Sequence, residues 1–339
     1  MIEKLKFAVV GCGHIGKRHI KVITNNENAE LIAVCDIERN QLSGIEEFLK
    51  DIDYFQDYEE MLKNSEADII CICTPHGLHA EMSILAADYK KHVLVEKPMS
   101  LDSKKGALMI EAAKKNEVKL YVVKQNRYNT PIFLTNKALN EGKLGKVFMV
   151  QCNVMWNRND AYYEQSSWRG SLKTEGGALY TQVSHFLDLL IWWFGDIEEA
   201  KTILDTLNHQ IEIEDCGVSA LKFNSGVIGS LNWTNCVYNS NYEGSITIIA
   251  EKGTIKIGGR YLNEIEHWDV NSYPLPLDVE FEDKPNSYGS YQGSSSNHDV
   301  LMNDLVLQII NDRKGVVEGE EGLKSIEAIE KIYKETKMK

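Results

Sequence analysis

Short apolar runs alternate with amphipathic segments over the first third of the chain. The apolar runs lie at residues 7–10, 31–35, 69–73, 93–95 and 118–123, with a weaker one at 54–55. Between them, helical spacing predicts helices at about 15–24, 58–63, 78–89 and 103–116. Strands that alternate with helices favour a parallel sheet with helical crossovers. We therefore predict an N-terminal α/β domain over residues 1–125.

The pattern changes after Asn129. It predicts a strand near 146–156, one long helix at 177–194, and longer alternating strands at 218–223, 226–233 and 245–258. Turn sequences at 224–226 and 251–253 favour antiparallel pairing. Residues 271–296 are rich in Ser, Pro, Tyr, Gly and Asn and predict a long loop. The second domain, residues 126–312, should therefore be α+β with a large, mainly antiparallel open sheet, followed by a C-terminal helix within 313–339.

Composition narrows the classes of partner. The 339 residues suffice for two domains, and the formal net charge of -13 without a dense basic cluster argues against non-specific binding to nucleic acid or anionic membrane. No apolar stretch approaches the roughly 20 residues of a membrane span, so we expect a soluble, cytoplasmic protein. The seven cysteines are scattered without metal-ligand spacing, so we expect no metal.

A glycine-rich segment opens the first predicted helix. It runs Gly11-Cys12-Gly13-His14-Ile15-Gly16, directly after a strand. This spacing allows a tight turn, close approach of a pyrophosphate and close helix packing, with phosphates at the helix start. Asp36 ends the next strand, 20 residues after Gly16, where it can accept hydrogen bonds from ribose hydroxyls and repel a 2′-phosphate. The pattern predicts a Rossmann domain that binds NAD rather than NADP, although Asp36 could also cap the strand.

Two further motifs carry candidate chemistry. Glu96-Lys97-Pro98 ends a buried run at the carboxyl edge of the predicted sheet, where such sheets bind ligands. A lysine beside a redox cofactor suggests hydroxyl chemistry. Farther along, Thr181, Ser184, His185 and Asp188 share one side of the long helix. His185 could be a buried histidine bonded to Asp188, or a catalytic group.

These motifs, with Thr74-Pro75 and with Gly176-Gly177 leading to His185, resemble the glucose-fructose oxidoreductase, inositol dehydrogenase and MocA family over nearly the whole chain. The resemblance implies NAD(P)-dependent oxidation or reduction of a sugar or polyol carbon, and dimers or tetramers built through the second sheet. It maps the catalytic pair onto Lys97 and His185. The cofactor-site residues are then Gly11, Gly13, His14, Ile15, Gly16, Asp36, Thr74, Pro75, His79, Glu96, Lys97 and Gln125.

A narrower likeness involves residues 124–129, 156–163, 167–170, 181–186 and 296–299. These segments resemble the UDP-N-acetylglucosaminuronate 3-dehydrogenases of bacterial surface-polysaccharide synthesis. Such enzymes oxidise the C3 hydroxyl of a UDP-linked N-acetylhexosaminuronic acid, and some regenerate NAD with 2-oxoglutarate, a possible second partner. Many polyol dehydrogenases of the family carry an aspartate four residues before the histidine. Thr181 stands there in this chain, which weakens a plain inositol dehydrogenase assignment.

A UDP-uronic acid carries phosphates and a carboxylate, which arginines bind well. Arg158 and Arg169 flank aromatic residues able to stack on a base or sugar. The candidate substrate-site residues are Lys97, Arg127, Asn157, Arg158, Tyr162, Trp168, Arg169, Thr181, Gln182, His185 and His298.

Alcohol oxidation requires the hydroxyl proton to leave as hydride passes to the nicotinamide. A neutral imidazole suits proton acceptance near neutral pH, so we favour His185 as the base. Lys97 would donate a hydrogen bond to the developing alkoxide, although a desolvated lysine could itself be the base. Two alternatives remain open: a dehydrogenase of a free sugar or inositol, and a non-catalytic NAD-binding regulator.

Overall fold

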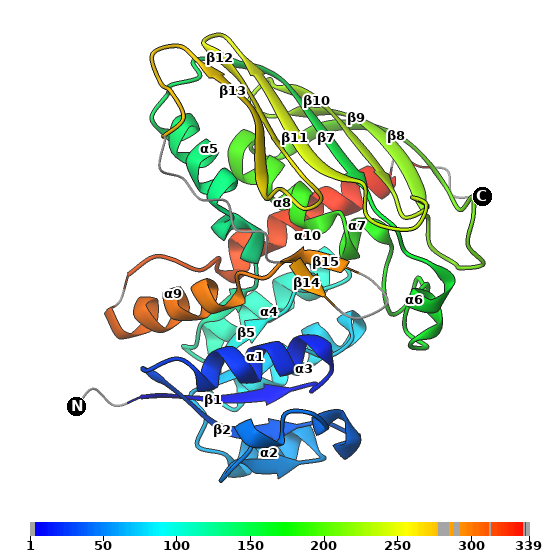
Figure 1. Cartoon of the computed structure of the whole chain (residues 1–339). Helices are drawn as coiled ribbons and strands as arrows, with labels where there is room; N and C mark the ends of the chain where they lie inside the picture. The colour runs from blue at the N-terminus through cyan, green and yellow to red at the C-terminus, as the bar shows by residue number, and fades with distance from the viewer. Residues whose placement is uncertain (1–3, 277–284, 288–291, 312, 335, 337–339) are drawn as a thin grey trace. The chain divides into compact units, whose positions relative to one another are not determined.

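A computed structural model describes residues 4–276, 285–287, 292–311, 313–334 and 336. The chain divides into two compact units (Figure 1). Unit 1 comprises the residues up to Lys124 together with His298–Ile326, and unit 2 comprises Gln125–Asn297 together with the residues from Glu327 onward.

Unit 1 is built on a six-stranded parallel sheet in the order β3-β2-β1-β4-β5-β6. Its strands are β1 (Leu5–Val10), β2 (Ala29–Cys35), β3 (Asp53–Phe55), β4 (Ile69–Ile72), β5 (His92–Val95) and β6 (Leu120–Val122). The crossover helices are α1 (His14–Thr24), α2 (Tyr58–Asn64), α3 (His79–Asp88) and α4 (Ser103–Lys115). β4 is buried at every residue, because helices cover a parallel sheet on both faces. The strand order reverses between β1 and β4, which is where such sheets bind ligands.

The chain returns to unit 1 through α9 (His298–Asn311) and the start of α10 (Gly319–Lys334), so the compact units differ from the predicted division at 126–312 and 313–339. α9 packs against α1. Val317, which follows α9, accepts a hydrogen bond at its carbonyl oxygen from the amide of Val122 in β6 (2.8 Å). These contacts join residues distant in sequence, so local patterns could not place the boundary.

Unit 2 carries a seven-stranded sheet in the order β13-β12-β11-β7-β10-β9-β8. Its strands are β7 (Val147–Met155), β8 (Ile197–Asp205), β9 (Cys216–Phe223), β10 (Ile228–Thr234), β11 (Glu243–Ala250), β12 (Gly253–Gly258) and β13 (Glu264–Val270). Pairing is antiparallel except between β7 and β10. A smaller pair joins β14 (Pro285–Ser287) to β15 (Gln292–Ser295), within the predicted loop.

The helices of unit 2 lie on one face of this sheet in Figure 1. They include α5 (Thr130–Asn140), α6 (Asp160–Glu164), α7 (Ala178–Thr181) and α8 (Ser184–Phe194). The long helix predicted at 177–194 is split into α7 and α8. The strands predicted over 245–258, with a turn at 251–253, form the hairpin of β11 and β12. Several sheet residues have exposed apolar side chains: Phe148, Ile203, Val218, Ile228 and Ile249.

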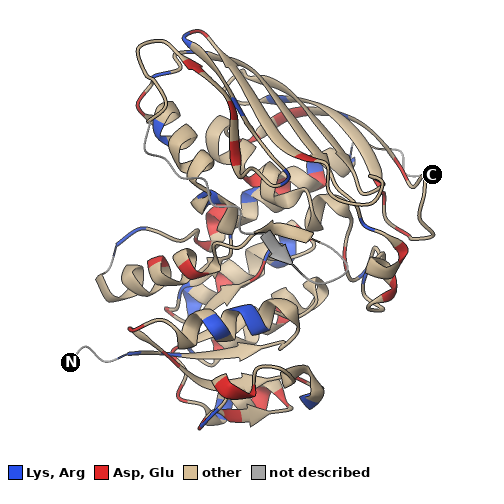
Figure 2. Ribbon diagram, in the orientation of Figure 1, with Lys and Arg blue, Asp and Glu red and all other residues tan. Residues whose placement is uncertain are grey.

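Charged residues of both signs are interspersed along the described ribbon in Figure 2. No helix among the described residues is long and apolar enough to cross a membrane.

Candidate active site

The glycine loop after β1 has two glycines that the protein itself requires. Gly11 has φ +83°, and a Cβ there would lie 2.8 Å from the backbone of Cys73 and Thr74. A Cβ on Gly16 would lie 1.9 Å from the Gly11 carbonyl oxygen, so α1 could not pack on the loop. At Gly13, by contrast, a Cβ would meet nothing within 4 Å. The space beside Gly13 fits the close approach of a dinucleotide pyrophosphate.

The start of α1 supplies donors for that pyrophosphate. Gly13 is the N-cap residue, no side chain caps the helix, and its first turn has no acidic residue. The first amide groups of a helix lack intrahelical acceptors and favour anions. His14 and Ile15 stand in this first turn, as predicted for a cofactor site.

Asp36 lies beside the same loop at the end of β2. Its carboxylate accepts hydrogen bonds from the amides of Cys12 (2.6 Å) and Glu38 (2.9 Å). The predicted capping role is therefore real. A carboxylate has about four acceptor positions, so two amide bonds leave capacity for the ribose hydroxyls.

Replacing Gly13 with alanine should weaken NAD binding about tenfold or more while leaving thermal stability nearly unchanged, because the added methyl group meets only the pyrophosphate position. Gly16→Ala is the contrasting variant. It should lower the free energy of unfolding by about 1–3 kcal/mol, because its methyl group overlaps the Gly11 carbonyl. Calorimetric NAD titration and thermal denaturation measure the two effects. Unchanged NAD affinity in Gly13→Ala would contradict the placement of the pyrophosphate beside Gly13.

Glu96 connects three parts of unit 1. Its Oε1 lies 2.9 Å from His19 Nε2 and 3.4 Å from His298 Nε2, and its Oε2 accepts the Lys97 amide at 3.2 Å. Burial alone would raise the pKa of Glu96, but hydrogen bonds from His19 and His298 bring it well below its usual value. This ionised carboxylate fixes the backbone at half-buried Lys97. His19 is not among the predicted site residues. His298 lies beside Glu96, and its contact with the substrate stays a prediction.

His79 joins the loops that follow β4 and β5. Its Nδ1 lies 2.7 Å from the Pro98 carbonyl oxygen and its Nε2 lies 2.8 Å from that of Thr74. Two carbonyl partners favour a protonated ring, whereas burial lowers the pKa of His79. Only the protonated ring donates to both carbonyls and so ties Thr74-Pro75 to the Glu96-Lys97-Pro98 motif, whereas the neutral ring donates to one of them. Either way His79 has a supporting role beside the predicted cofactor contacts.

In unit 2, Gly177 lets a distant tyrosine approach the start of α7. Gly177 has φ +138°, and a Cβ there would lie 2.0 Å from Tyr333 Oη. That hydroxyl donates to Glu214 Oε1 at 2.6 Å, and the Leu179 amide donates to the same oxygen at 3.3 Å. This packing explains the Gly176-Gly177 motif and fixes the helix that leads to His185.

The buried carboxyl group of Glu214 should make the stability of the folded protein depend on pH. Burial raises the pKa of this carboxyl to about 7, against hydrogen bonds from Tyr333 and backbone amides. An unfolded glutamate ionises near pH 4.3, so the folded state binds the extra proton between about pH 4.3 and 7 and stability falls as the pH rises. Between these pH values the wild-type protein should lose on the order of 3 kcal/mol of unfolding free energy that Glu214→Gln does not lose. Urea denaturation of both proteins from pH 4.5 to 8 measures it. A stability difference independent of pH would contradict the assignment.

Thr181, Gln182 and His185 are all buried where α7 passes into α8. The Thr181 hydroxyl lies 2.9 Å from the Gly177 carbonyl oxygen and 2.7 Å from Gln182 Oε1. Gln182 Nε2 donates to Tyr162 Oη at 3.1 Å. Gln182 therefore links the start of α8, which carries His185, to α6, which carries Tyr162.

Two arginines stack on Tyr162 within unit 2. The Arg169 guanidinium lies 4.0 Å from the centre of the Tyr162 ring and 5.5 Å from that of Trp168. Arg158 lies 5.2 Å from the Tyr162 ring and donates to the Asn157 carbonyl at 2.6 Å. The structure thus brings together the predicted residues from Asn157 to Arg169.

Arg127 and Gln125 belong to the short helix η4 (Gln125–Tyr128). Arg127 forms a bidentate ion pair with Asp188 at 2.8 and 3.0 Å, and its guanidinium lies 4.5 Å from the centre of the Trp192 ring. Asp188, a candidate partner of His185, therefore balances the charge of Arg127. Gln125 is buried, and its Oε1 has no hydrogen-bond partner among the described residues.

The fold and these residues define an oxidoreductase with an NAD-binding Rossmann domain and a second α/β domain. Residues 5–124 match the oxidoreductase family, NAD-binding Rossmann fold, and residues 136–339 match the C-terminal alpha/beta domain of that family. The chain belongs to the glucose-fructose oxidoreductase, inositol dehydrogenase and MocA family.

Among solved structures, the chain is similar to two particular dehydrogenases of this family. The WlbA dehydrogenase of Chromobacterium violaceum, in complex with NADH and UDP-GlcNAcA, is 37% identical, with a TM-score of 0.89 over 98% of this chain and 94% of that one. The Bordetella pertussis WlbA dehydrogenase, with the same ligands, is 36% identical with a TM-score of 0.89, covering 98% of this chain and 96% of that one. A myo-inositol 2-dehydrogenase of Thermotoga maritima is 26% identical over 74% of each chain.

Proposed function

We propose that this chain is an NAD-dependent dehydrogenase that oxidises the C3 hydroxyl of a UDP-N-acetylhexosaminuronic acid to a ketone. The observation that carries the proposal is the likeness, over 98% of the chain, to two dehydrogenase structures that hold NADH and UDP-GlcNAcA. Curated relatives that act on free polyols share less of the sequence, 26% for the inositol dehydrogenase. Thr181 adds support, because an aspartate stands at that position in many polyol dehydrogenases of the family.

The proposed chemistry divides between two side chains. Bound NAD supplies the hydride acceptor. His185 takes the proton from the C3 hydroxyl, and Lys97 donates a hydrogen bond to the oxygen as negative charge develops there. Glu96 supports Lys97, because its carboxylate accepts the Lys97 amide and is held by two histidines.

For the anionic groups of the substrate we propose Arg158 and Arg169 as the principal contacts. Their guanidinium groups pack on the buried Tyr162 ring, and half-buried Trp168 is the aromatic side chain that we propose for contact with a base or sugar. Arg127 already balances Asp188, so it stays a secondary candidate. Asn157, Gln182 and His298 remain predicted substrate-site residues.

Three finer assignments accompany this function. We propose that the exposed apolar side chains of the unit 2 sheet are buried in a homodimer or homotetramer. We propose 2-oxoglutarate as the compound that regenerates NAD on the enzyme. The 3-keto product would then enter cytoplasmic synthesis of surface-polysaccharide sugars.

Substrate comparison tests the proposal. Purified protein with NAD should form NADH from UDP-GlcNAcA, with 2-oxoglutarate added if turnover stalls, and UDP should inhibit competitively. Free N-acetylglucosamine, glucose and myo-inositol serve as matched controls and should react far more slowly. Robust turnover of an unlinked polyol without inhibition by UDP would favour the free-sugar alternative. No turnover of any substrate, with NAD still bound, would favour the regulator.

A further inference from the structure

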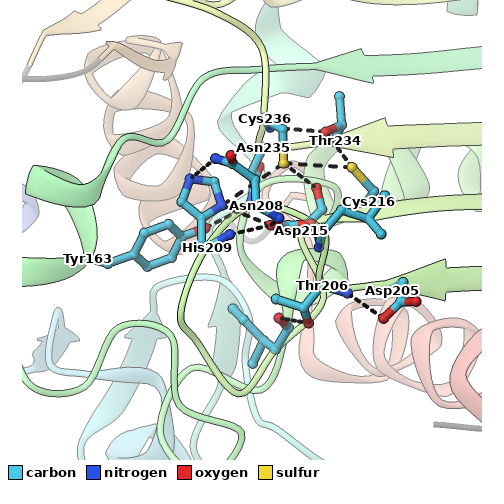
Figure 3. Close-up of polar contacts among 12 residues, drawn as sticks. Tyr163, Asp205, Thr206, Asn208, His209, Asp215, Cys216, Thr234, Asn235 and Cys236 are labelled. Carbon is cyan, nitrogen blue, oxygen red and sulfur yellow. Dashed lines mark hydrogen bonds and ion pairs between the residues drawn. The ribbon is translucent and has the colours of Figure 1, made fainter. Parts of the chain in front are cut away.

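Two cysteines outside the proposed catalytic residues meet at the end of the β9–β10 hairpin. Cys216 pairs with Thr234 across the hairpin, and Cys236 follows two residues beyond the end of β10. The two sulfur atoms lie 3.7 Å apart (Figure 3). The other five cysteines are buried, whereas Cys216 and Cys236 are only partly so. These two thiols are therefore in contact and within reach of a small reagent.

The groups around the thiols have other partners. Asp215 accepts hydrogen bonds from the amides of Leu207 (2.8 Å), Asn208 (2.9 Å) and His209 (3.0 Å). It also lies 2.9 Å from His209 Nδ1. The carboxylate thus fixes the turn before β9, and its acceptor positions are filled.

This arrangement argues against zinc binding and against an activated nucleophile. Ligand atoms of His209, Asp215 and Cys236 lie within 4.8 Å of one another, as a metal site requires. However, only three ligand atoms converge here among the described residues, and Asp215 already accepts three backbone amides as well as facing His209 Nδ1. A structural zinc site needs four ligands, and a cysteine nucleophile needs a free base. Burial raises the pKa of Cys236 to about 12, which also argues against a resident thiolate.

We propose that Cys216 and Cys236 form a reversible disulfide when the protein meets a low-molecular-weight disulfide such as glutathione disulfide. The Cys216 thiolate attacks one sulfur of the oxidant and releases one glutathione thiol. The Cys236 sulfur then attacks Cys216 Sγ and releases the second. Two protein thiols are oxidised, one disulfide is reduced to two thiols, and the two protons pass to the released thiols.

The local geometry supports this order of attack. The Thr234 hydroxyl lies 2.9 Å from Cys216 Sγ, so the attacking sulfur is held at the open end of the hairpin. The sulfur atoms must close from 3.7 Å to about 2.05 Å. Cys236 lies outside the strand, so this closure does not have to break the β9–β10 ladder.

Closing the disulfide would move the neighbouring Asn235. Its Nδ2 donates to Tyr163 Oη at 3.3 Å and to Gln182 Oε1 at 3.4 Å. Gln182 is a predicted substrate-site residue, so oxidation should weaken binding of the UDP-sugar by about fivefold or more. This consequence rests on the proposed function, whereas the disulfide itself does not.

Intact-mass measurement and peptide mapping after equilibration with glutathione and its disulfide test the proposal. The full-length protein should lose the mass of two hydrogen atoms, give one peptide pair linking Cys216 to Cys236, and recover with dithiothreitol. Cys216→Ser should give no internal disulfide. Two thiols that remain open to iodoacetamide after this treatment would overturn the proposal, as would a disulfide involving any of the other five cysteines. Stoichiometric zinc that protects both thiols would overturn it in favour of a metal site.

Calorimetry with UDP-GlcNAcA separates the consequence from the disulfide. We expect the oxidised protein to bind UDP-GlcNAcA at least about fivefold more weakly than the reduced protein. NADH affinity should not change. Equal affinity in both states would refute the coupling through Asn235. Failure of the reduced protein to bind UDP-GlcNAcA would count against the proposed function and leave the disulfide intact.

Discussion

Replacing His185 with asparagine is expected to lower kcat for NADH formation from UDP-GlcNAcA by about 10²–10⁴-fold, the usual contribution of a general base. Asparagine has a similar size and can still form hydrogen bonds, but it cannot accept the hydroxyl proton. His185 is buried on α8, and asparagine is no larger than histidine, so we expect the variant to fold. Stopped-flow measurement of NADH formation gives the rate, and NADH titration checks that cofactor binding is kept.

Ser184→Ala is the matched control on the same helix. The Ser184 hydroxyl contacts the Thr181 carbonyl at 3.3 Å, so its removal changes a local contact but no proton acceptor. We expect kcat to change by only about twofold to threefold, since the lost bond is worth about 1 kcal/mol or less. A His185→Asn enzyme with wild-type kcat would remove His185 from the mechanism.

Replacing Lys97 with methionine should lower kcat by about 10²–10³-fold, as for loss of one donor to a developing oxyanion. Binding of NADH should be largely kept, because the Lys97 amide still donates to Glu96. Lys104→Met, an exposed lysine on α4, is the control and should leave kcat unchanged. Wild-type kcat in Lys97→Met would refute the assigned role.

Lys97→Arg distinguishes charge stabilisation by Lys97 from a role of Lys97 as the base. Arginine remains charged and can donate a hydrogen bond, but it does not act as a base near neutral pH. If Lys97 stabilises charge, Lys97→Arg should regain part of the activity lost in Lys97→Met. If Lys97 is the base, the two variants should be equally slow.

Most of unit 1 could be predicted because its signals are local. Continuous apolar runs mark buried parallel strands, and Asp57 and Asp102 cap the helices that follow them. The six predicted strands and four predicted helices are all present, within a few residues at each end.

The second sheet was harder to predict because its two edge strands carry many charged residues and lack a clear apolar pattern. β8 and β13 were missed, and both are edge strands with many charged residues, a composition that discourages pairing with other chains. The parallel pairing of β7 with β10 joins strands distant in sequence. Its register is set by tertiary contacts that local alternation does not contain.

The candidate site likewise contains parts that local sequence patterns predict and parts that depend on contacts between distant residues. The glycine spacing and Asp36 are a local pattern, and the structure gives each of them the expected surroundings. The partners of Glu96 could not be predicted, since His19 comes from the first helix and His298 from the ninth. The contact between Cys216 and Cys236 likewise depends on the hairpin register, not on their spacing in the sequence.

The most direct test of the central claim uses UDP-GlcNAcA with deuterium at C3 of the sugar. Mass spectrometry after one turnover should find the deuterium in the reduced cofactor, or in 2-hydroxyglutarate when 2-oxoglutarate is present, together with an unlabelled 3-keto sugar. Reduced cofactor without deuterium, or a product that keeps its C3 label, would contradict oxidation at C3.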